Sequence, residues 1–284
     1  MMPRPAAALV HVEDLMQRDI VFLSDLGIRD EAVGVCHAVV ARIAPESHVI
    51  DLTHGIPPMD VLAGGLVLRH SLPFAPDRAI VLAVVDPGVG TRRRAIVVET
   101  AHGRLMVGPD NGVLSLAWLA DGGAARAVEI AAEDVVLRPV SPVFHGRDVF
   151  SPAAAHLAAG RPIGDLGPPV DVASLTVLET AEPEVGSGRV VAEVLDVDRF
   201  GNVRLNVRPA DLVTAGLDAS SLWVETLSLK KEARRVSTFG EVATGEYAIL
   251  EDAWGWMALI RDEGNAANQF AVGRGDRVWL SAGA

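Results

Sequence analysis

The alternation of strand and helix patterns over residues 19–90 constrains the fold of this chain more than any other feature. Short apolar runs and amphipathic helical patterns follow one another at 19–27, 29–45, 48–58, 60–72 and 79–90. Such alternation is typical of a parallel sheet covered by helices, because each parallel strand must be reached through a crossover. Further strands and helices are expected at 95–100, 104–113, 113–120 and 147–160. The first part of the chain is therefore predicted to be an α/β domain with a mainly parallel sheet flanked by helices.

The pattern changes near residue 177. A polar segment with proline and glycine, 178–188, is expected to be a linker. Beyond it, short runs rich in valine and leucine alternate with turns, which favours a smaller antiparallel β-barrel-like or sandwich domain. The predicted organisation is a flexible extension, an α/β catalytic domain, a linker and a small β domain, at 1–18, 19–177, 178–188 and 189–284.

Composition excludes several classes of function. The formal net charge of -12 argues against a nucleic-acid partner, which would require a basic surface. The single cysteine, Cys36, rules out an intramolecular disulfide, and its apolar helical context favours a buried side chain over a catalytic thiol. No run reaches the length of a membrane span, and the first residues are too acidic for a signal peptide. We therefore expect no membrane partner and a cytoplasmic location.

Three of the predicted strands end in polar residues, at Ser24 and Asp25, at Thr53 and His54, and at Asp86. In an open α/β sheet, ligands bind beyond the carboxyl ends of the strands, so these loops are expected to converge. Asp51 and His54 could contribute to a metal site, but polar residues at strand ends are more often hydrogen-bonded structure. Because the histidines also lack the spacing of metal ligands, no metal is expected.

The loop after the third strand breaks an apolar run. Residues 83–99, AVVDPGVGTRRRAIVVE, place an acid, two glycines and three arginines between two strand patterns. Asp86 could simply cap the amides of an Asp-Pro-Gly turn, and the arginines could be solvated. A histidine such as His145, which opens a predicted helix, is also usually structural. Brought together, however, an acid, an arginine and a histidine could form an acid–base set.

Seven blocks occur in order along the chain: SDLGIRDEAVG, IDLTHGIPPMDVLAG, VVDPGVGTRRRAI, VGPDNGVLS, FHGRDVFSPAAAHLA, DVDRFGNVRLNV and EGNAAN. They resemble the blocks of the S-adenosyl-L-methionine (SAM) hydroxide adenosyltransferases, the hydrolase relatives of fluorinase and chlorinase. The resemblance implies that water attacks the 5′ carbon of SAM and gives adenosine and L-methionine. It also implies that Asp86, Arg93 and His145 are catalytic, that SAM is a substrate and that no cofactor is needed. Which residue acts as the base is left open.

The resemblance further implies a set of substrate contacts. Asp25 matches the acid that binds the ribose hydroxyls, although it could equally be an acid at a helix N-terminus. Asp198 and Asn202 match positions near methionine and adenine, and the Asn202 amide offers both a donor and an acceptor. Phe239 could pack on the adenine face, although an isolated aromatic residue is more often in a core. Ala267 would act through its backbone.

One segment departs from the family pattern. Where Asn-Ser-x-Gly is common, this chain has Asp252, Ala253, Trp254 and Gly255, so a serine expected at the methionine end of the substrate is missing. Trp254 is nevertheless expected to contact substrate.

Two alternative functions stay open. One is a SAM-dependent halogenase, although halogenases lack the Asp-Arg-His set. The other is a non-catalytic adenosine- or SAM-binding protein.

The resemblance also predicts how the chain assembles. A homotrimer is implied, with SAM held between the larger domain of one subunit and the small β domain of its neighbour.

Overall fold

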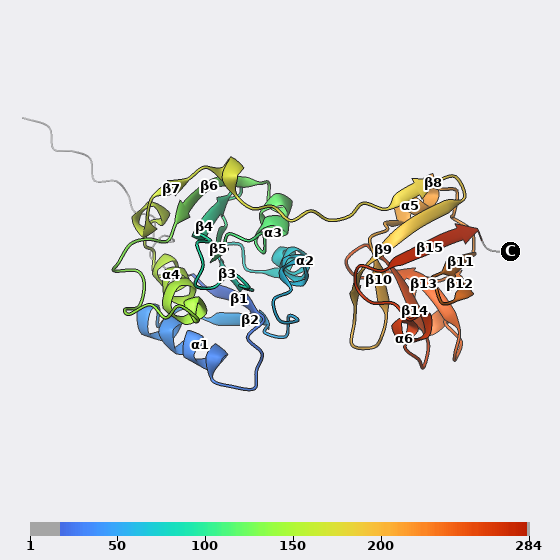
Figure 1. Cartoon of the computed structure of the whole chain (residues 1–284), viewed down its shortest axis with the longest axis horizontal. Helices are drawn as coiled ribbons and strands as arrows, with labels where there is room; N and C mark the ends of the chain where they lie inside the picture. Colours follow the sequence, from blue (N-terminus) through green and yellow to red (C-terminus); the bar gives the residue numbers. More distant parts are fainter. Residues whose placement is uncertain (1–17, 283–284) are drawn as a thin grey trace, which may run out of the picture. The chain divides into compact units, whose positions relative to one another are not determined.

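The computed structural model describes residues 18–282 (Figure 1). The chain divides into two compact units, the first ending at Leu178 and the second beginning at Glu179. Apart from Arg18, the expected N-terminal extension lies outside the described residues. Within the described part, no helix has both the length and the apolar character needed to cross a membrane.

The first unit contains a seven-stranded sheet with the order β2-β1-β3-β5-β4-β6-β7. Its strands are Ile20–Ser24 (β1), Val49–Thr53 (β2), Ile80–Val84 (β3), Ala95–Thr100 (β4), Leu105–Pro109 (β5), Ala124–Glu129 (β6) and Pro169–Val170 (β7). Strands β2, β1, β3 and β5 run parallel, whereas β4, β6 and β7 add antiparallel pairs. The predicted α/β architecture with a mainly parallel sheet is confirmed.

Helices cover both faces of this sheet. They are Ala32–Ile43 (α1), Val61–Ser71 (α2), Ser115–Ala120 (α3) and Ser151–Ala158 (α4). Residues of β3 alternate between two cores: Ile80 and Leu82 pack with residues of α1 and α4, whereas Val81 and Ala83 pack with residues of α2 and α3. Because successive strand residues point to opposite faces, a strand buried on both sides must be apolar throughout, which explains the continuous run at β3.

Two local features of this unit matter for the site. Residues Gly146–Phe150 form one π-helical turn before α4, a geometry often found at functional positions. Cys36 on α1 is fully buried, and burial raises the pKa of its thiol, as expected for an inert side chain. Short 3₁₀ turns of the chain lie at Leu72–Phe74, Ile163–Leu166, Val172–Ser174 and Phe239–Glu241.

The second unit is a closed β-barrel. Its strands are Arg189–Val197 (β9), Val203–Leu205 (β10), Ser221–Glu225 (β11), Lys230–Arg235 (β12), Tyr247–Glu251 (β13), Met257–Arg261 (β14) and Arg277–Ala282 (β15), with helices Pro209–Thr214 (α5) and Ala266–Phe270 (α6). Pairing of β9 with β10 closes the barrel. The predicted barrel-like domain is confirmed, but it is mixed, because β12 and β13 run parallel.

The segment expected to be a linker contains a strand. Residues Glu184–Gly186 (β8) pair antiparallel with β9 at the edge of the second sheet. The polar composition of 178–188 concealed this strand, since all three of its residues are exposed and carry no apolar periodicity.

Candidate active site

The carboxyl ends of β1 and β3 lie side by side and place two acids at one edge of the sheet. The parallel register pairs Ser24 with Val84, and the Asp25 amide donates to the Val84 carbonyl at 3.4 Å. An Asp25 carboxylate oxygen accepts the Met59 amide at 2.8 Å. Asp86 follows two residues after Val84. The loops after these strands therefore converge, as the topology predicts.

Asp86 is ion-paired rather than a turn cap. Arg93 Nε donates to Asp86 Oδ1 at 2.9 Å, and Arg93 Nη2 donates to Oδ2, so the guanidinium holds both carboxylate oxygens. The turn itself is closed by the backbone, from the Val89 amide to the Asp86 carbonyl at 3.2 Å. The side chains are buried, with exposed fractions of 6% for Asp86 and 11% for Arg93. A bidentate pair in this setting is strong and fixes both groups in space.

The three consecutive arginines have different roles. Arg92 is exposed, whereas Arg93 binds Asp86. Arg94 instead contacts Asp110, from Nε at 2.8 Å and from Nη2 at 2.5 Å, and also donates to the Ser174 carbonyl at 2.7 Å. Arg94 therefore ties the loop to the rest of the unit, and Arg93 faces the site.

His145 completes a three-residue network. Its Nδ1 lies 2.7 Å from Arg93 Nη2, so one guanidinium bridges the acid and the imidazole. The Arg93 guanidinium also lies over the Phe150 ring, 5.0 Å from its centroid. A Cβ at Gly90 would lie 2.4 Å from the Pro142 carbonyl oxygen, so the loop carrying Arg93 packs directly on the segment that carries His145. The structure thus brings together the predicted Asp86, Arg93 and His145.

The contact with Arg93 fixes the protonation of His145. An arginine side chain only donates hydrogen bonds, so Nδ1 of His145 must accept and the ring proton resides on Nε2. Burial of the ring, together with the Arg93 charge, lowers the pKa of His145 below its ordinary value. His145 is therefore a neutral imidazole with an N–H at Nε2.

Asp148, in the same sequence block, is structural. It is buried and accepts hydrogen bonds from Arg147 Nε at 2.6 Å and from the Ser141 amide at 2.8 Å. Burial opposes ionisation, but these hydrogen bonds lower the pKa of Asp148 overall. The acid therefore ties the π-helical turn that follows His145 to the backbone at Ser141.

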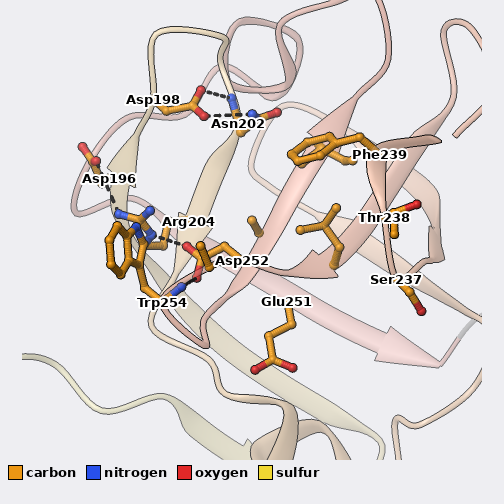
Figure 2. Close-up of a pocket in the computed structure, with 14 residues that line it drawn as sticks. Asp196, Asp198, Asn202, Arg204, Ser237, Thr238, Phe239, Glu251, Asp252 and Trp254 are labelled. Carbon is orange, nitrogen blue, oxygen red and sulfur yellow. Dashed lines mark hydrogen bonds and ion pairs between the residues drawn. The ribbon is translucent and has the colours of Figure 1, made fainter. Parts of the chain in front are cut away.

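The second unit has a pocket of about 440 Å³, within the range of small-molecule sites (Figure 2). Four predicted substrate residues line it: Asp198, Asn202, Phe239 and Trp254. Arg204, Asp252, Ser237, Thr238 and Glu251 also line it, and the sequence pattern did not single them out as contacts.

Asp198 and Asn202 are pre-arranged at this pocket. Asp198 Oδ1 accepts the amides of Phe200 and Asn202 at 2.8 and 3.0 Å, and Oδ2 accepts Asn202 Nδ2 at 2.8 Å. This uses one side-chain donor of Asn202 and fixes its amide plane, and Phe239 lines the same pocket (Figure 2). Phe239 is 60% exposed, so it is a surface aromatic and not a core residue.

The segment 252–255, which departs from the family pattern, forms a rigid turn. Asp252 Oδ1 accepts the amides of Trp254 and Trp256 at 2.8 and 3.0 Å, and Oδ2 accepts Arg204 Nε at 2.5 Å. The negative charge of Asp252 is therefore matched within the pocket wall. Ala253 lines the pocket and presents only a methyl group there.

Ala267 is not among the residues that line this pocket. Its amide donates to the Gly201 carbonyl and its carbonyl accepts the Val272 amide, both at 3.0 Å, and the residue is 5% exposed. These bonds support the loop that carries Asn202. A direct contact between the Ala267 backbone and substrate stays a prediction.

Comparison with known proteins identifies the class. The model of the SAM hydroxide adenosyltransferase N-terminal domain matches residues 20–167, and that of the C-terminal domain matches residues 192–279. The chain therefore belongs to the SAM hydroxide adenosyltransferase family.

Individual relatives match along almost the whole chain. It is 44% identical to the (R)-S-adenosyl-L-methionine hydrolase of Salinispora tropica, covering 93% of this chain and 98% of that protein. The hydrolase of the same name from Thermus thermophilus is 40% identical, with 93% and 99% covered. A fluorinase from Nocardia brasiliensis is 25% identical, with 93% and 97% covered. The crystal structure of an uncharacterized conserved protein from Thermotoga maritima has a TM-score of 0.85 at 36% identity and covers 92% of this chain and 99% of its own.

Proposed function

We propose that this protein hydrolyses SAM by attack of water at the 5′ carbon, giving adenosine and L-methionine. The bridged Asp86, Arg93 and His145 network is the observation that carries the proposal. In the reaction, a bond forms between the water oxygen and C5′ while the C5′–S bond breaks. Its electron pair goes to sulfur, which leaves as the neutral thioether of methionine. Because the leaving group is neutral, the reaction needs no general acid at sulfur.

The remaining requirement is a water molecule held in line behind C5′ and a base for its proton. Arg93 occupies the Nδ1 lone pair of His145, which makes that nitrogen a poor proton acceptor. Asp86 retains further lone pairs, since a carboxylate offers about four acceptor positions and Arg93 uses two. We therefore assign proton acceptance to Asp86, water orientation to the Nε2–H of His145, and positioning of both groups to Arg93.

The substrate contacts follow from the two sites. Asp25 at the sheet edge would accept hydrogen bonds from the ribose hydroxyls. Phe239 would stack on adenine while Asn202 bonds to its edge, and Asp198 and Trp254 would lie towards the methionine end. The barrel pocket has the size and the mixed apolar and polar lining that a nucleoside requires.

Product analysis tests the reaction. Purified protein incubated with SAM should release adenosine and methionine in equal amounts, with or without chloride, as separated by chromatography. A chlorinated nucleoside formed only with chloride would instead show a halogenase. Unchanged SAM together with measurable binding would show a non-catalytic SAM-binding protein.

We also propose a homotrimer in which the α/β unit of one subunit and the barrel unit of its neighbour share one substrate. Co-expression of Asp86→Asn with Asn202→Ala tests this, since each variant damages one half of the site. If sites form between subunits, random mixing restores about a quarter of wild-type activity, from sites that pair two intact halves. If each subunit formed its own site, every site would carry a defect and no activity would return. The cytoplasmic location and the absence of a cofactor stay predictions.

A further inference from the structure

Three potential metal ligands meet beside the sheet edge, outside the catalytic network. Asp51 Oδ1, on β2, lies 2.9 Å from His37 Nε2, on α1, and 3.0 Å from His54 Nε2, in the loop after β2. All three ligand atoms lie within 4.8 Å of one another. Two ligands of a tetrahedral zinc ion, each about 2.0–2.1 Å from the metal, lie roughly 3.3 Å apart, which is close to the two shorter separations.

The buried histidine of this cluster lacks a hydrogen bond at the nitrogen that faces the cluster. The His54 side chain is 5% exposed, and among the described residues its Nε2 has no hydrogen-bond partner. Asp51 Oδ1 is near enough, at 3.0 Å, but it is not aligned with the ring N–H direction. Buried polar atoms of native proteins are nearly always satisfied, so this nitrogen needs an occupant. The Nε2 lone pair of His54 would be satisfied by a cation that Asp51 also binds.

The other ring nitrogen of His54 is held as metal-ligating histidines usually are. His54 Nδ1 lies 2.7 Å from Ser24 Oγ, and the Phe22 ring packs edge-on at 4.7 Å between ring centroids. Such an outer partner fixes the tautomer and the orientation of a ligating imidazole. The side chains of His37 and Asp51 are 35% and 39% exposed, so the cluster is also open to solvent on one side. An ion could enter and keep a water ligand there.

We propose that His37, Asp51 and His54 bind one divalent transition-metal ion of the zinc class. Two imidazoles and one carboxylate suit Zn²⁺ and are poor for Ca²⁺ or Mg²⁺, which prefer oxygen ligands. The ion would join α1 to the loop after β2. In that loop the His54 carbonyl also accepts the amide of Gly27, two residues after Asp25, at 2.8 Å. The proposed role is to stabilise this part of the fold, and no step of the hydrolysis requires it.

Metal titration of the full-length protein tests the site. After chelation and desalting, Zn²⁺ is added in competition with a chromophoric chelator, and Co²⁺ is added separately to record visible absorption. We expect one Zn²⁺ per chain and the intense visible bands of low-coordinate Co²⁺. His37→Gln and Asp51→Asn should each weaken binding by more than about 10–100-fold, because losing even an outer partner of a ligand costs that much. Zn²⁺ should raise the melting temperature of the wild type but not of these variants.

The matched control is His48→Gln. His48 also lies 3.2 Å from an acid, Asp19, but its side chain is 85% exposed and only two groups meet there. This variant should bind Zn²⁺ as the wild type does. The proposal is overturned if the wild type binds less than one ion in the titration, or if His37→Gln binds as tightly as His48→Gln. His37 is half-exposed, so its substitution should leave the fold intact; circular dichroism checks this, and His37→Gln alone decides if Asp51→Asn fails to fold.

Discussion

Replacing Asp86 with asparagine separates a catalytic carboxylate from a structural one. The substitution keeps the shape of the side chain but removes the charge that Arg93 pairs with. Removing one partner of a buried ion pair costs about 3–5 kcal/mol, and the 11% exposure of Arg93 places this pair at the lower end, near 3 kcal/mol. For a unit of this size that corresponds to a fall in melting temperature of roughly 6–12 °C. Stability alone therefore cannot reveal the role of Asp86.

Turnover distinguishes the two roles. If Asp86 accepts the proton of water, Asp86→Asn should lower kcat by roughly a hundredfold or more, with little change in SAM affinity. The matched control is Asp110→Asn, because Asp110 is buried and pairs with the neighbouring Arg94. That control should also lose stability, though less because the Arg94 side chain is 31% exposed, and it should keep its turnover. Both variants are assayed for adenosine release well below their melting temperatures, with SAM binding measured by calorimetry. Equal turnover in the two variants would refute the assignment of Asp86 as the base.

Three further outcomes are expected. Burial and the Arg93 charge lower the pKa of His145, so as the pH falls this histidine is protonated in the unfolded chain before it is protonated in the folded one. Between about pH 7 and pH 5 the wild type should therefore lose more stability, measured by urea unfolding, than His145→Gln. Gly90→Ala places a Cβ 2.4 Å from the Pro142 carbonyl at φ +75° and should destabilise and inactivate the protein, whereas Gly103→Ala, with φ +81° but no atom within 4 Å, should cost only about 1–2 kcal/mol and stay active. Turnover should survive exhaustive chelation at temperatures where the protein stays folded, since a sulfonium needs no Lewis acid; activity restored only by added metal would contradict this.

The α/β fold could be predicted because its strands are buried on both faces. The run Ile80–Val84 is apolar throughout, and an uninterrupted run between helical patterns has few other interpretations. The short edge strand β8 could not be predicted, since exposed residues have no periodicity to detect. The parallel pairing of β12 with β13 was also hidden, because it depends on how the chain crosses the barrel and not on either strand's composition.

The candidate site was predictable in its residue types but not in its pairings. Arg93 and Arg94 are adjacent and chemically identical, yet one binds Asp86 and the other binds Asp110. Successive side chains of an extended segment point in opposite directions, so Arg93 and Arg94, just before β4, reach different acids. The sequence does not show which of the two faces Asp86. His37 was missed for a similar reason: it lies on α1, fourteen residues before Asp51, and the packing of that helix brings the two together.

The departure at Ala253 offers a direct test of where the methionine end of SAM binds. Ala253 lies on the turn whose amides are capped by Asp252, so the backbone there is rigid and a small side chain can change without moving it. Ala253→Ser would add to the pocket the hydroxyl that the family pattern carries at this position. One added hydrogen bond to a charged group contributes about 1.5 kcal/mol or more, so the KM for SAM should fall roughly tenfold. Since this contact is equally strong in the ground and transition states, kcat should not change. An unchanged KM would mean that this wall of the pocket does not hold the methionine end, and a lower kcat would mean that the turn takes part in the chemistry.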